Sequence, residues 1–260
     1  VDAGSRTIKV VLLDSDSLQL IGAGVVDQGV EQDELAQRLL HTVLQEHGLQ
    51  PQDVRMVVAT GYGRKLIRGA DATITEITCQ AAGIAHCVPG ARTVIDIGGQ
   101  DSKLLRLSAD GAVTDFVMND RCAAGTGRFL EVVATRLGVR LACLGEMASK
   151  SNVAANISSM CVVFAETEIV GLLAQEISPE DIVAGVQAAI AARVTAMACR
   201  QVTAPIVFTG GVAMVPGMDK ALRASLGESV SVAENPQLTC ARGAAILAAK
   251  KLRNSSPPGR

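Results

Sequence analysis

The residues Val94-Ile-Asp-Ile-Gly-Gly-Gln-Asp-Ser-Lys103 say most about how this 260-residue chain folds. An apolar run ends in two glycines and a second apolar run begins at Leu104, which is typical of two buried strands joined by a hairpin turn. The start of the chain has the same order, because Asp2-Ala-Gly-Ser5 is followed by Lys9 and by another hairpin. Two copies of one module, each opening on an acidic, glycine-rich hairpin, predict an α/β fold with two similar lobes facing a cleft.

The expected lobe boundaries follow from the restart of this pattern near residues 88–92. We expect lobe I at residues 1–91, with a C-terminal helix at about 243–260 packing back on it. Lobe II is expected at residues 92–242. Apolar spacing predicts strands at residues 7–13, 18–26, 54–59, 93–97, 104–107, 113–118 and 205–208. It predicts helices at residues 31–47, 73–87, 125–137, 161–175, 179–200, 217–226 and 240–252.

Composition and charge exclude several classes of protein. Hydrophobic residues make up 48% of the chain and charged residues 19%, which excludes a disordered chain. With no Trp, one Tyr and four Phe, the chain lacks the aromatic platforms that bind single-stranded nucleic acid. A formal charge of −2 without a basic run argues against nucleic acid or a membrane surface as partner. No run approaches the roughly 20 apolar residues that span a bilayer. We expect a cytoplasmic protein in which a few residues, including the initiator Met, precede Val1.

The hairpin tips carry the residue types that bind phosphate. Glycine lets the backbone approach an anion closely, while backbone N–H groups and a hydroxyl donate to it. We therefore assign nucleotide binding to Gly4, Ser5 and Lys9 in the first hairpin and to Gly98, Gly99, Ser102 and Lys103 in the second. Each group includes a lysine that adds a positive charge. Gly210 and Gly211 follow a buried strand and precede a helix, where a base or ribose can pack.

Acidic and amide side chains at the same hairpins are the candidate catalytic residues. Asp2 and Asp96 end the first strand of each module, where a carboxylate suits a Mg²⁺ ion that keeps several of its waters. Gln100 suits the positioning of phosphate and water, and Asp101 is the remaining candidate for a general base. The chain has neither a G-x-x-x-x-G-K-[ST] loop nor a G-x-G-x-x-G fingerprint at a strand–helix junction. The pattern predicts a nucleotide-binding protein outside those two classes.

Two of the seven cysteines are expected at the start of a helix. Cys122 precedes the helix predicted at 125–137, and Cys161 begins the one at 161–175. A helix N-terminus lowers the pKa of a thiol and stabilises negative charge, and both effects favour a thiolate-ligated iron–sulfur cluster. A cubane cluster needs four thiolates, which two chains related by a twofold axis can supply. From the residues alone, Cys122 and Cys161 are equally well explained as buried or merely reactive cysteines.

The remaining cysteines and the histidines show no ligand pattern. We expect five cysteines to fill the core or surface, of which the first two fall near the lobe seam: Cys79, Cys87, Cys143, Cys199 and Cys240. The histidines lie in helical or helix-end contexts without ligand partners, at positions His41, His47 and His86.

Motifs that cover nearly the whole chain give it a resemblance to a known family. They are Asp2-Ala-Gly-Ser5, Ala59-Thr-Gly-Tyr-Gly-Arg64, Thr75-Glu-Ile-Thr-Cys79, Val94 to Lys103, Phe116 to Glu131, Ser159 to Glu168 and Phe208-Thr-Gly-Gly-Val-Ala213. In combination they resemble the activator ATPases of 2-hydroxyacyl-CoA dehydratases, in a wider group that includes the benzoyl-CoA reductase ATPase subunits. The forms at 98–103 and 119–127 resemble the activators more than the reductase subunits.

The resemblance implies a homodimer of actin-like (ribonuclease H-like) protomers with an ATP/ADP and Mg²⁺ cleft on the two hairpins. It implies one [4Fe–4S] cluster shared between two chains and held by Cys122 and Cys161 of each. It also adds Gly125 and Gly127 to the expected nucleotide-binding residues. In such a protein ATP drives a rotation of the helices at the cluster, lowers its potential and passes one electron to a partner iron–sulfur enzyme. The partner would be a 2-hydroxyacyl-CoA dehydratase or a related reductase, with a ferredoxin or flavodoxin as upstream donor.

Two other functions stay open at this point. A small-molecule kinase of the same fold would use Asp101 as a general base facing a sugar pocket. A non-enzymatic filament or scaffold of actin type would show slow or absent ATP turnover and concentration-dependent assembly.

Overall fold

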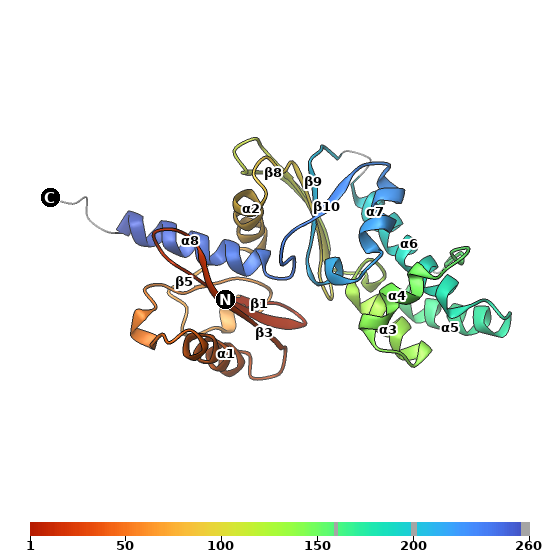
Figure 1. The fold of residues 1–260 in the computed structure, drawn as a ribbon, viewed down its shortest axis with the longest axis horizontal. Helices are drawn as coiled ribbons and strands as arrows, with labels where there is room; N and C mark the ends of the chain where they lie inside the picture. The colour runs from red at the N-terminus through yellow and green to blue at the C-terminus, as the bar shows by residue number, and fades with distance from the viewer. Residues whose placement is uncertain (159–160, 199–201, 256–260) are drawn as a thin grey trace. The chain divides into compact units, whose positions relative to one another are not determined.

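The computed structural model in Figure 1 describes residues 1–158, 161–198 and 202–255. The chain divides into two compact units, each described here by itself. Unit 1 consists of Val1–Gly90, Asp110–Val113 and the segment that begins at Leu238, and unit 2 consists of Ala91–Ala109 and Thr114–Gln237.

Unit 1 is built on a three-stranded sheet in the order β1-β2-β3, with helices packed around it. Strand β1 pairs antiparallel with β2 so that Asp2 faces Lys9, and two short strands, β4 and β5, pair in parallel. Its helices and strands are β1 (Asp2–Ala3), β2 (Thr7–Leu13), β3 (Leu20–Asp27), α1 (Gln32–Glu46), β4 (Val58–Ala59), β5 (Ala72–Thr73), α2 (Glu76–Cys87) and α8 (Thr239–Ser255). Single 3₁₀ turns lie at η1 (Pro51–Asp53) and η2 (Arg64–Leu66).

Helices α2 and α8 of unit 1 pack closely because both carry glycine at the contact. An ideal Cβ on Gly83 would lie 2.0 Å from the carbonyl oxygen of Thr239, and one on Gly243 would lie 1.7 Å from that of Cys79. A buried hydrogen bond of 2.8 Å from Gln80 Nε2 to Thr239 Oγ1 joins the same two helices. The C-terminal helix therefore packs directly on the backbone of α2.

Unit 2 contains a five-stranded sheet in the order β10-β9-β6-β7-β8. Strands β10, β9 and β6 are parallel, and β6 pairs antiparallel with β7. Its helices and strands are β6 (Thr93–Ile97), β7 (Ser102–Leu107), β8 (Val113–Asn119), α3 (Gly127–Leu137), α4 (Leu144–Ser149), α5 (Val162–Ala174), α6 (Pro179–Met197), β9 (Ile206–Thr209), α7 (Met218–Leu226) and β10 (Val230–Val232). The 3₁₀ turns are η3 (Ala123–Gly125), η4 (Leu141–Cys143) and η5 (Gly211–Met214).

The core of unit 2 forms between the sheet and its helices. Helix α6 buries one face along its whole length, with residues one, three or four positions apart: Ile182, Val183, Val186, Ile190 and Val194. These side chains belong to the same buried cluster as Ile95 and Phe208 of the sheet. The helix starts as predicted, because the Ser178 side chain accepts from the N–H of Asp181 at 3.1 Å. Residues 199 and 200, included in the predicted helix, lie outside the described residues, as does the expected helical tail at 256–260.

One strand prediction was wrong in its extent. The apolar run 54–59 was expected to be a strand throughout, but only β4, two residues long, is one. Its partner β5 is equally short, and the N–H of Val57 donates to Asp71 Oδ2 at 2.7 Å instead of to a strand. A 3₁₀ turn, which begins at Pro51, also ends just before the apolar run, so the run does not start as a paired strand. The continuous apolar run therefore overestimated the length of the strand, because a strand extends only as far as a neighbouring strand pairs with it.

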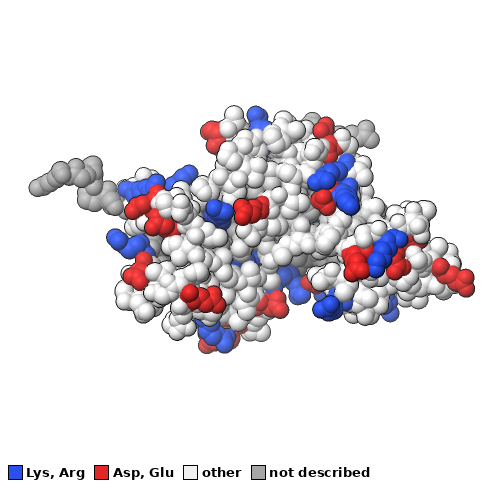
Figure 2. Space-filling model, viewed as in Figure 1, with Lys and Arg blue, Asp and Glu red and all other residues white. Residues whose placement is uncertain are grey.

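On the face drawn in Figure 2, acidic and basic side chains alternate in small groups, with no single broad basic field. Within the part of the chain that the structure describes, no helix combines the length and the apolar character needed to cross a bilayer.

Candidate functional site

The hairpin of unit 2 places the predicted phosphate-binding residues at one tip. Strands β6 and β7 pair Asp96 with Lys103, and the N–H of Gly98 donates to the carbonyl of Asp101 at 2.9 Å to close the turn. Lys103 is buried at 2% exposure, and its Nζ donates to Asp101 Oδ2 at 2.7 Å. An ideal Cβ on Gly98 would lie 2.7 Å from Asp101 Oδ1, so only glycine leaves room for this carboxylate. The tip is thus organised by a buried lysine–aspartate pair.

The hairpin of unit 1 has the same strand register, but its lysine pairs with the strand aspartate and not with an aspartate of the turn. Asp2 faces Lys9 in the same register, and the N–H of Gly4 donates to the carbonyl of Thr7 at 3.1 Å. Lys9 Nζ lies 3.1 Å from Asp2 Oδ2. The other carboxylate oxygen, Asp2 Oδ1, is buried and has no hydrogen-bond partner among the described residues. A buried acceptor without a donor fits a site for a cation or its water ligands.

A threonine–glycine pair lies beside each of the two strand aspartates, and the sequence analysis did not recognise the two pairs as equivalent. Asp2 forms a parallel bridge with Thr60, just as Asp96 pairs with Thr209 of β9. The glycine that follows, Gly61 or Gly210, has a φ of +86° or +89°, and its ideal Cβ would lie 2.4 Å from Oδ1 of the adjacent aspartate. Thr-Gly after an apolar run in each half was the signal that could have identified Gly61 as the counterpart of Gly210.

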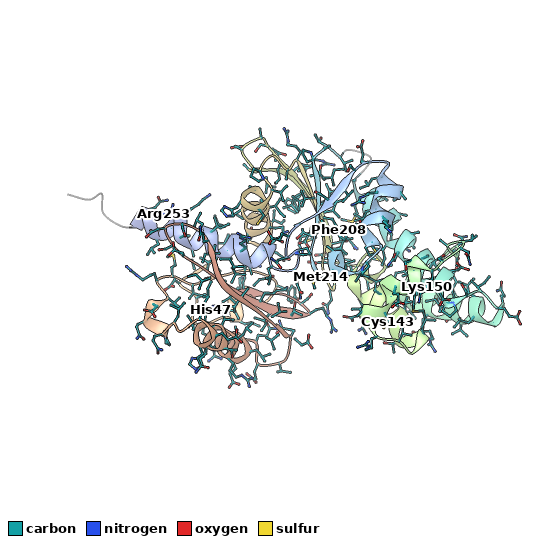
Figure 3. All side chains as sticks on the ribbon, viewed as in Figure 1. His47, Cys143, Lys150, Phe208, Met214 and Arg253 are labelled. Atoms are coloured by element: carbon teal, nitrogen blue, oxygen red, sulfur yellow. The ribbon has the colours of Figure 1, made fainter. Side chains whose placement is uncertain are left out.

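The loop that follows Gly210 is also held in place. The N–H of Gly210 and the hydroxyl of Thr209 both donate to the carbonyl of Pro236, at 3.0 and 2.7 Å. Gly211 opens η5, which ends at Met214; this side chain, labelled in Figure 3, is 59% exposed. At the predicted place for a base or ribose, no atom lies within 4 Å of an ideal Cβ on Gly211, and the apolar side chain of Met214 is exposed.

The N-terminus of α3 is hydrogen-bonded to the hairpin tip of unit 2. The N–H of Gly127 donates to the carbonyl of Gly98 at 2.9 Å, and that of Arg128 donates to Gly99 at 2.8 Å. An ideal Cβ on Gly127 would lie 3.1 Å from the Gly98 carbonyl oxygen. Gly125 and Gly127 are both buried. The absence of a side chain at Gly127 therefore lets α3 approach the turn at Gly98 closely.

Exposure separates the two candidate ligand cysteines from the others. Of the six cysteines that the structure describes, only Cys122 and Cys161 are exposed; the buried or half-buried ones are Cys79, Cys87, Cys143 and Cys240. Cys199 lies outside the described residues, as do Ser159 and Met160 of the motif around Cys161. The interpretation of Cys122 and Cys161 as buried cysteines that only fill space is therefore excluded.

Each of these cysteines caps a helical segment, although one prediction needs correction. Cys161 is the N-cap of α5, and its carbonyl accepts from the N–H of Ala165 at 2.9 Å. Cys122 caps only the 3₁₀ turn η3, and α3 begins five residues later with Thr126 as its cap. The Thr126 hydroxyl is the stronger N-cap, so it sets the start of the longer helix.

The segment before Cys161 is anchored to α6 by one half-buried carboxylate. Asp181 Oδ1 accepts from the Ser151 hydroxyl at 2.7 Å and from the N–H groups of Asn152 and Val153 at 3.0 and 3.1 Å. These hydrogen bonds, of which that from Ser151 has the largest effect, lower the pKa of Asp181 from 3.8 to about 2. The ionised form of Asp181 therefore helps to hold this segment in its folded position.

Replacing Asp181 by Asn is expected to change how stability depends on pH. The pKa is lower in the folded chain than in the unfolded one, so the carboxylate stabilises the fold above about pH 4 and loses this effect as the pH falls towards about 2. Asp181→Asn should lower the thermal midpoint near neutral pH, and its difference from wild type should shrink across that window. Circular dichroism melts at a series of pH values test this. A difference that stays constant across the window would contradict the role of the charge.

Helix α5 is tied both to its own N-terminal loop and to α3. Glu168 Oε1 accepts from the N–H and the hydroxyl of Ser158, at 2.8 and 2.6 Å. Arg136 of α3 forms an ion pair with Glu166 of α5. Side-chain contacts therefore join the helix that Cys161 caps to α3, which follows the turn capped by Cys122.

The chain as a whole is similar to known proteins. The model of the BadF/BadG/BcrA/BcrD ATPase family matches residues 1–248. The chain belongs to this ATPase family. The expectation of an ATPase and the resemblance found from the motifs are thereby confirmed.

Relatives in the BadF/BadG/BcrA/BcrD ATPase family match nearly full length. The activator of lactoyl-CoA dehydratase from Anaerotignum propionicum is 43% identical over 249 residues, 95% of each chain. The (R)-2-hydroxyglutaryl-CoA dehydratase activating ATPase from Acidaminococcus fermentans is 39% identical over 253 residues, 96% of each chain. The structure of the activator of the 2-hydroxyisocaproyl-CoA dehydratase from Clostridium difficile with bound ADPNP has a TM-score of 0.92 at 38% identity, covering 98% of this chain and 94% of that one. The expected actin-like α/β fold is confirmed.

Proposed function

We propose that this ATPase is an electron-transfer activator. It hydrolyses ATP to drive low-potential, one-electron transfer from a [4Fe–4S] cluster to a partner iron–sulfur enzyme, such as a 2-hydroxyacyl-CoA dehydratase. The observation that carries the proposal is the exposure of Cys122 and Cys161, alone among the described cysteines, on the unit that holds the Gly98–Gly99 hairpin. Relatives named as dehydratase activators support the same reading.

The residues present fit both the nucleotide and the cluster. The buried, unpaired Asp2 Oδ1 suits a Mg²⁺ ion or its water ligands, and an ADPNP-bound relative supports ATP and ADP as ligands. Two exposed thiols at helical N-caps suit thiolate ligation. When bound, the cluster supplies a centre that accepts and donates single electrons.

The shared cluster follows from the number of ligands. No group of three or more His, Cys, Asp or Glu side chains in residues 1–158, 161–198 and 202–255 could hold a metal by itself. A cubane needs four thiolates, so Cys122 and Cys161 of one chain would be completed by the same pair from a second copy. We therefore propose a homodimer. We also propose a ferredoxin or flavodoxin as the upstream electron donor.

The hydrogen bonds of unit 2 provide a route from nucleotide to cysteine. Phosphate held at the tip would act on Gly98 and Gly99, whose carbonyls accept from the first N–H groups of α3. Thr126 joins α3 to the turn after Cys122, because its hydroxyl donates to the carbonyl of Ala123 at 2.8 Å. A change at the phosphate is thus carried to the Cys122 segment through packed, hydrogen-bonded backbone.

The other assigned residues take supporting roles in this proposal. Asp101 pairs with the buried Lys103, so its carboxylate is not free to act as a general base on a sugar hydroxyl. We assign to Asp101 and Gln100 the orientation of a phosphate or a water. This arrangement disfavours the kinase alternative. Gly125 and Gly127 would serve the nucleotide through the close approach of α3 to the hairpin. The main nucleotide contacts remain assigned to the hairpin residues and to Gly210 and Gly211.

Anaerobic purification followed by cluster reconstitution tests the proposal. We expect a brown, oxygen-labile dimer with about four iron atoms per two chains, which hydrolyses ATP and reduces an iron–sulfur dehydratase only when ATP is present. A colourless protein that binds ATP would remove the electron-transfer role. Phosphoryl transfer to a sugar would establish the kinase alternative instead.

A further inference from the structure

Asn119, the last residue of β8, makes two hydrogen bonds to the backbone of Cys122. Its Nδ2 donates to the Cys122 carbonyl oxygen at 2.8 Å, and its Oδ1 accepts from the Cys122 N–H at 3.0 Å. A primary amide is suited to this contact because it carries a donor and an acceptor side by side. The side chain therefore clamps both polar backbone groups of one residue.

The clamp limits where the Cys122 thiol can lie. Cys122 is exposed, and its backbone is extended, with φ −125° and ψ 111°. The two hydrogen bonds fix the groups on either side of its Cα, so they limit the direction in which the Cα–Cβ bond projects. Strand β8 is hydrogen-bonded into the sheet of unit 2, and it anchors Asn119.

The surroundings leave space for this amide. An ideal Cβ on Gly125 would lie 3.3 Å from Asn119 Nδ2 and 3.6 Å from the hydroxyl of Ser102. A larger residue at 125 would crowd the amide. Gly125, assigned from the resemblance to nucleotide binding, also gives Asn119 room on the side facing β7.

We propose that Asn119 is a positioning residue that preorganises the Cys122 thiolate as a cluster ligand and slows the release of iron. The inference rests on the proposed function, because it assigns a role towards the same cluster. Groups that orient a metal ligand affect metal retention strongly even though they never touch the metal. Asn119 acts through the backbone of Cys122 and has no part in electron transfer itself.

The test compares iron release from reconstituted wild type, Asn119→Ala and Asn119→Asp. The variants are mixed anaerobically with bathophenanthroline disulfonate, and the absorbance of the iron chelate is followed with time. We expect Asn119→Ala to release iron about tenfold faster than wild type. Asn119→Asp keeps the size and the acceptor, but its carboxylate cannot donate to the Cys122 carbonyl, so faster release is expected there too. Asn152→Ala changes an exposed asparagine of the same unit and keeps the backbone N–H that donates to Asp181, so it should release iron at the wild-type rate.

Thermal midpoints and ADP binding of the same samples separate positioning from general destabilisation. A faster release with an unchanged midpoint and unchanged ADP affinity supports the clamp. If Asn119→Ala does not fold, the nearly isosteric Asn119→Asp decides. Release at the wild-type rate from every folded variant would overturn the inference while leaving the proposed function intact. A wild-type protein that takes up no iron would overturn both.

Discussion

Cys122→Ser and Cys161→Ser are each expected to abolish stable iron binding after anaerobic reconstitution. In the proposed dimer, one substitution removes two of the four thiolates, because both copies lose the same ligand. A serine hydroxyl is a poor substitute, since iron–sulfur clusters are held by thiolates and an alcohol does not ionise near neutral pH. Both residues are exposed, so neither substitution opens a cavity in the core. The measurements are iron and acid-labile sulfide per chain, together with the visible absorbance of the cluster.

ADP binding provides the internal control for these two variants. The main nucleotide contacts are assigned to the hairpin residues and to Gly210 and Gly211, and none of them is one of the two cysteines, so the ADP dissociation constant should change by less than about twofold. Cys143→Ser is the matched variant, because Cys143 is a half-buried cysteine of the same unit. It should retain the iron content of wild type. A Cys122→Ser or Cys161→Ser protein that keeps its full cluster would contradict the ligand assignment.

The sequence predicted the two hairpins well because their residue types follow from local chemistry. An apolar strand that ends in Asp-x-Gly is readable from side-chain pattern alone, and the Asp2–Lys9 and Asp96–Lys103 registers bear out the repeat. Positive φ has no such pattern. The repeated Thr-Gly marks Gly61 as the counterpart of Gly210, but its φ of +86° depends on the bridge between Asp2 and Thr60 and is not encoded in the side-chain pattern.

The contacts around the cysteines show where local sequence ceases to suffice. Cys122 was placed at a helix start, but the choice between capping by Cys122 and by Thr126 depends on hydrogen bonds from α3 to the hairpin. The Glu168 contact to Ser158 joins residues that are ten positions apart in the sequence. Such contacts are set by tertiary packing, and neither period 2 nor period 3.6 in the sequence encodes them.

Gly243→Ala is expected to destabilise unit 1 more than a single methyl group usually does. An ideal Cβ at residue 243 would lie 1.7 Å from the carbonyl oxygen and 2.6 Å from the carbonyl carbon of Cys79, and 2.8 Å from the N atom of Gly83. These are backbone atoms of α2, so no side chain can rotate away and the two helices must separate. Separation would weaken the buried Gln80–Thr239 hydrogen bond and the apolar cluster of Cys79, Cys240 and Ala244. We expect a loss of about 3 kcal/mol, at the upper end for overpacking, and a fall of about 10 °C in the thermal midpoint.

Gly171→Ala is the matched control for this substitution, because it also replaces a glycine inside a helix. Nothing lies within 4 Å of an ideal Cβ at residue 171 in α5, so the added methyl group meets no atom. Alanine has the higher helix propensity, and the variant should be as stable as wild type or more stable by up to about 1 kcal/mol. Amide hydrogen exchange can then show which elements Gly243→Ala destabilises. The protection of amide hydrogens should fall in α2 and α8, while the sheet of unit 2 should keep its wild-type protection. Equal midpoints for the two variants would show that α2 and α8 do not pack backbone against backbone at Gly243.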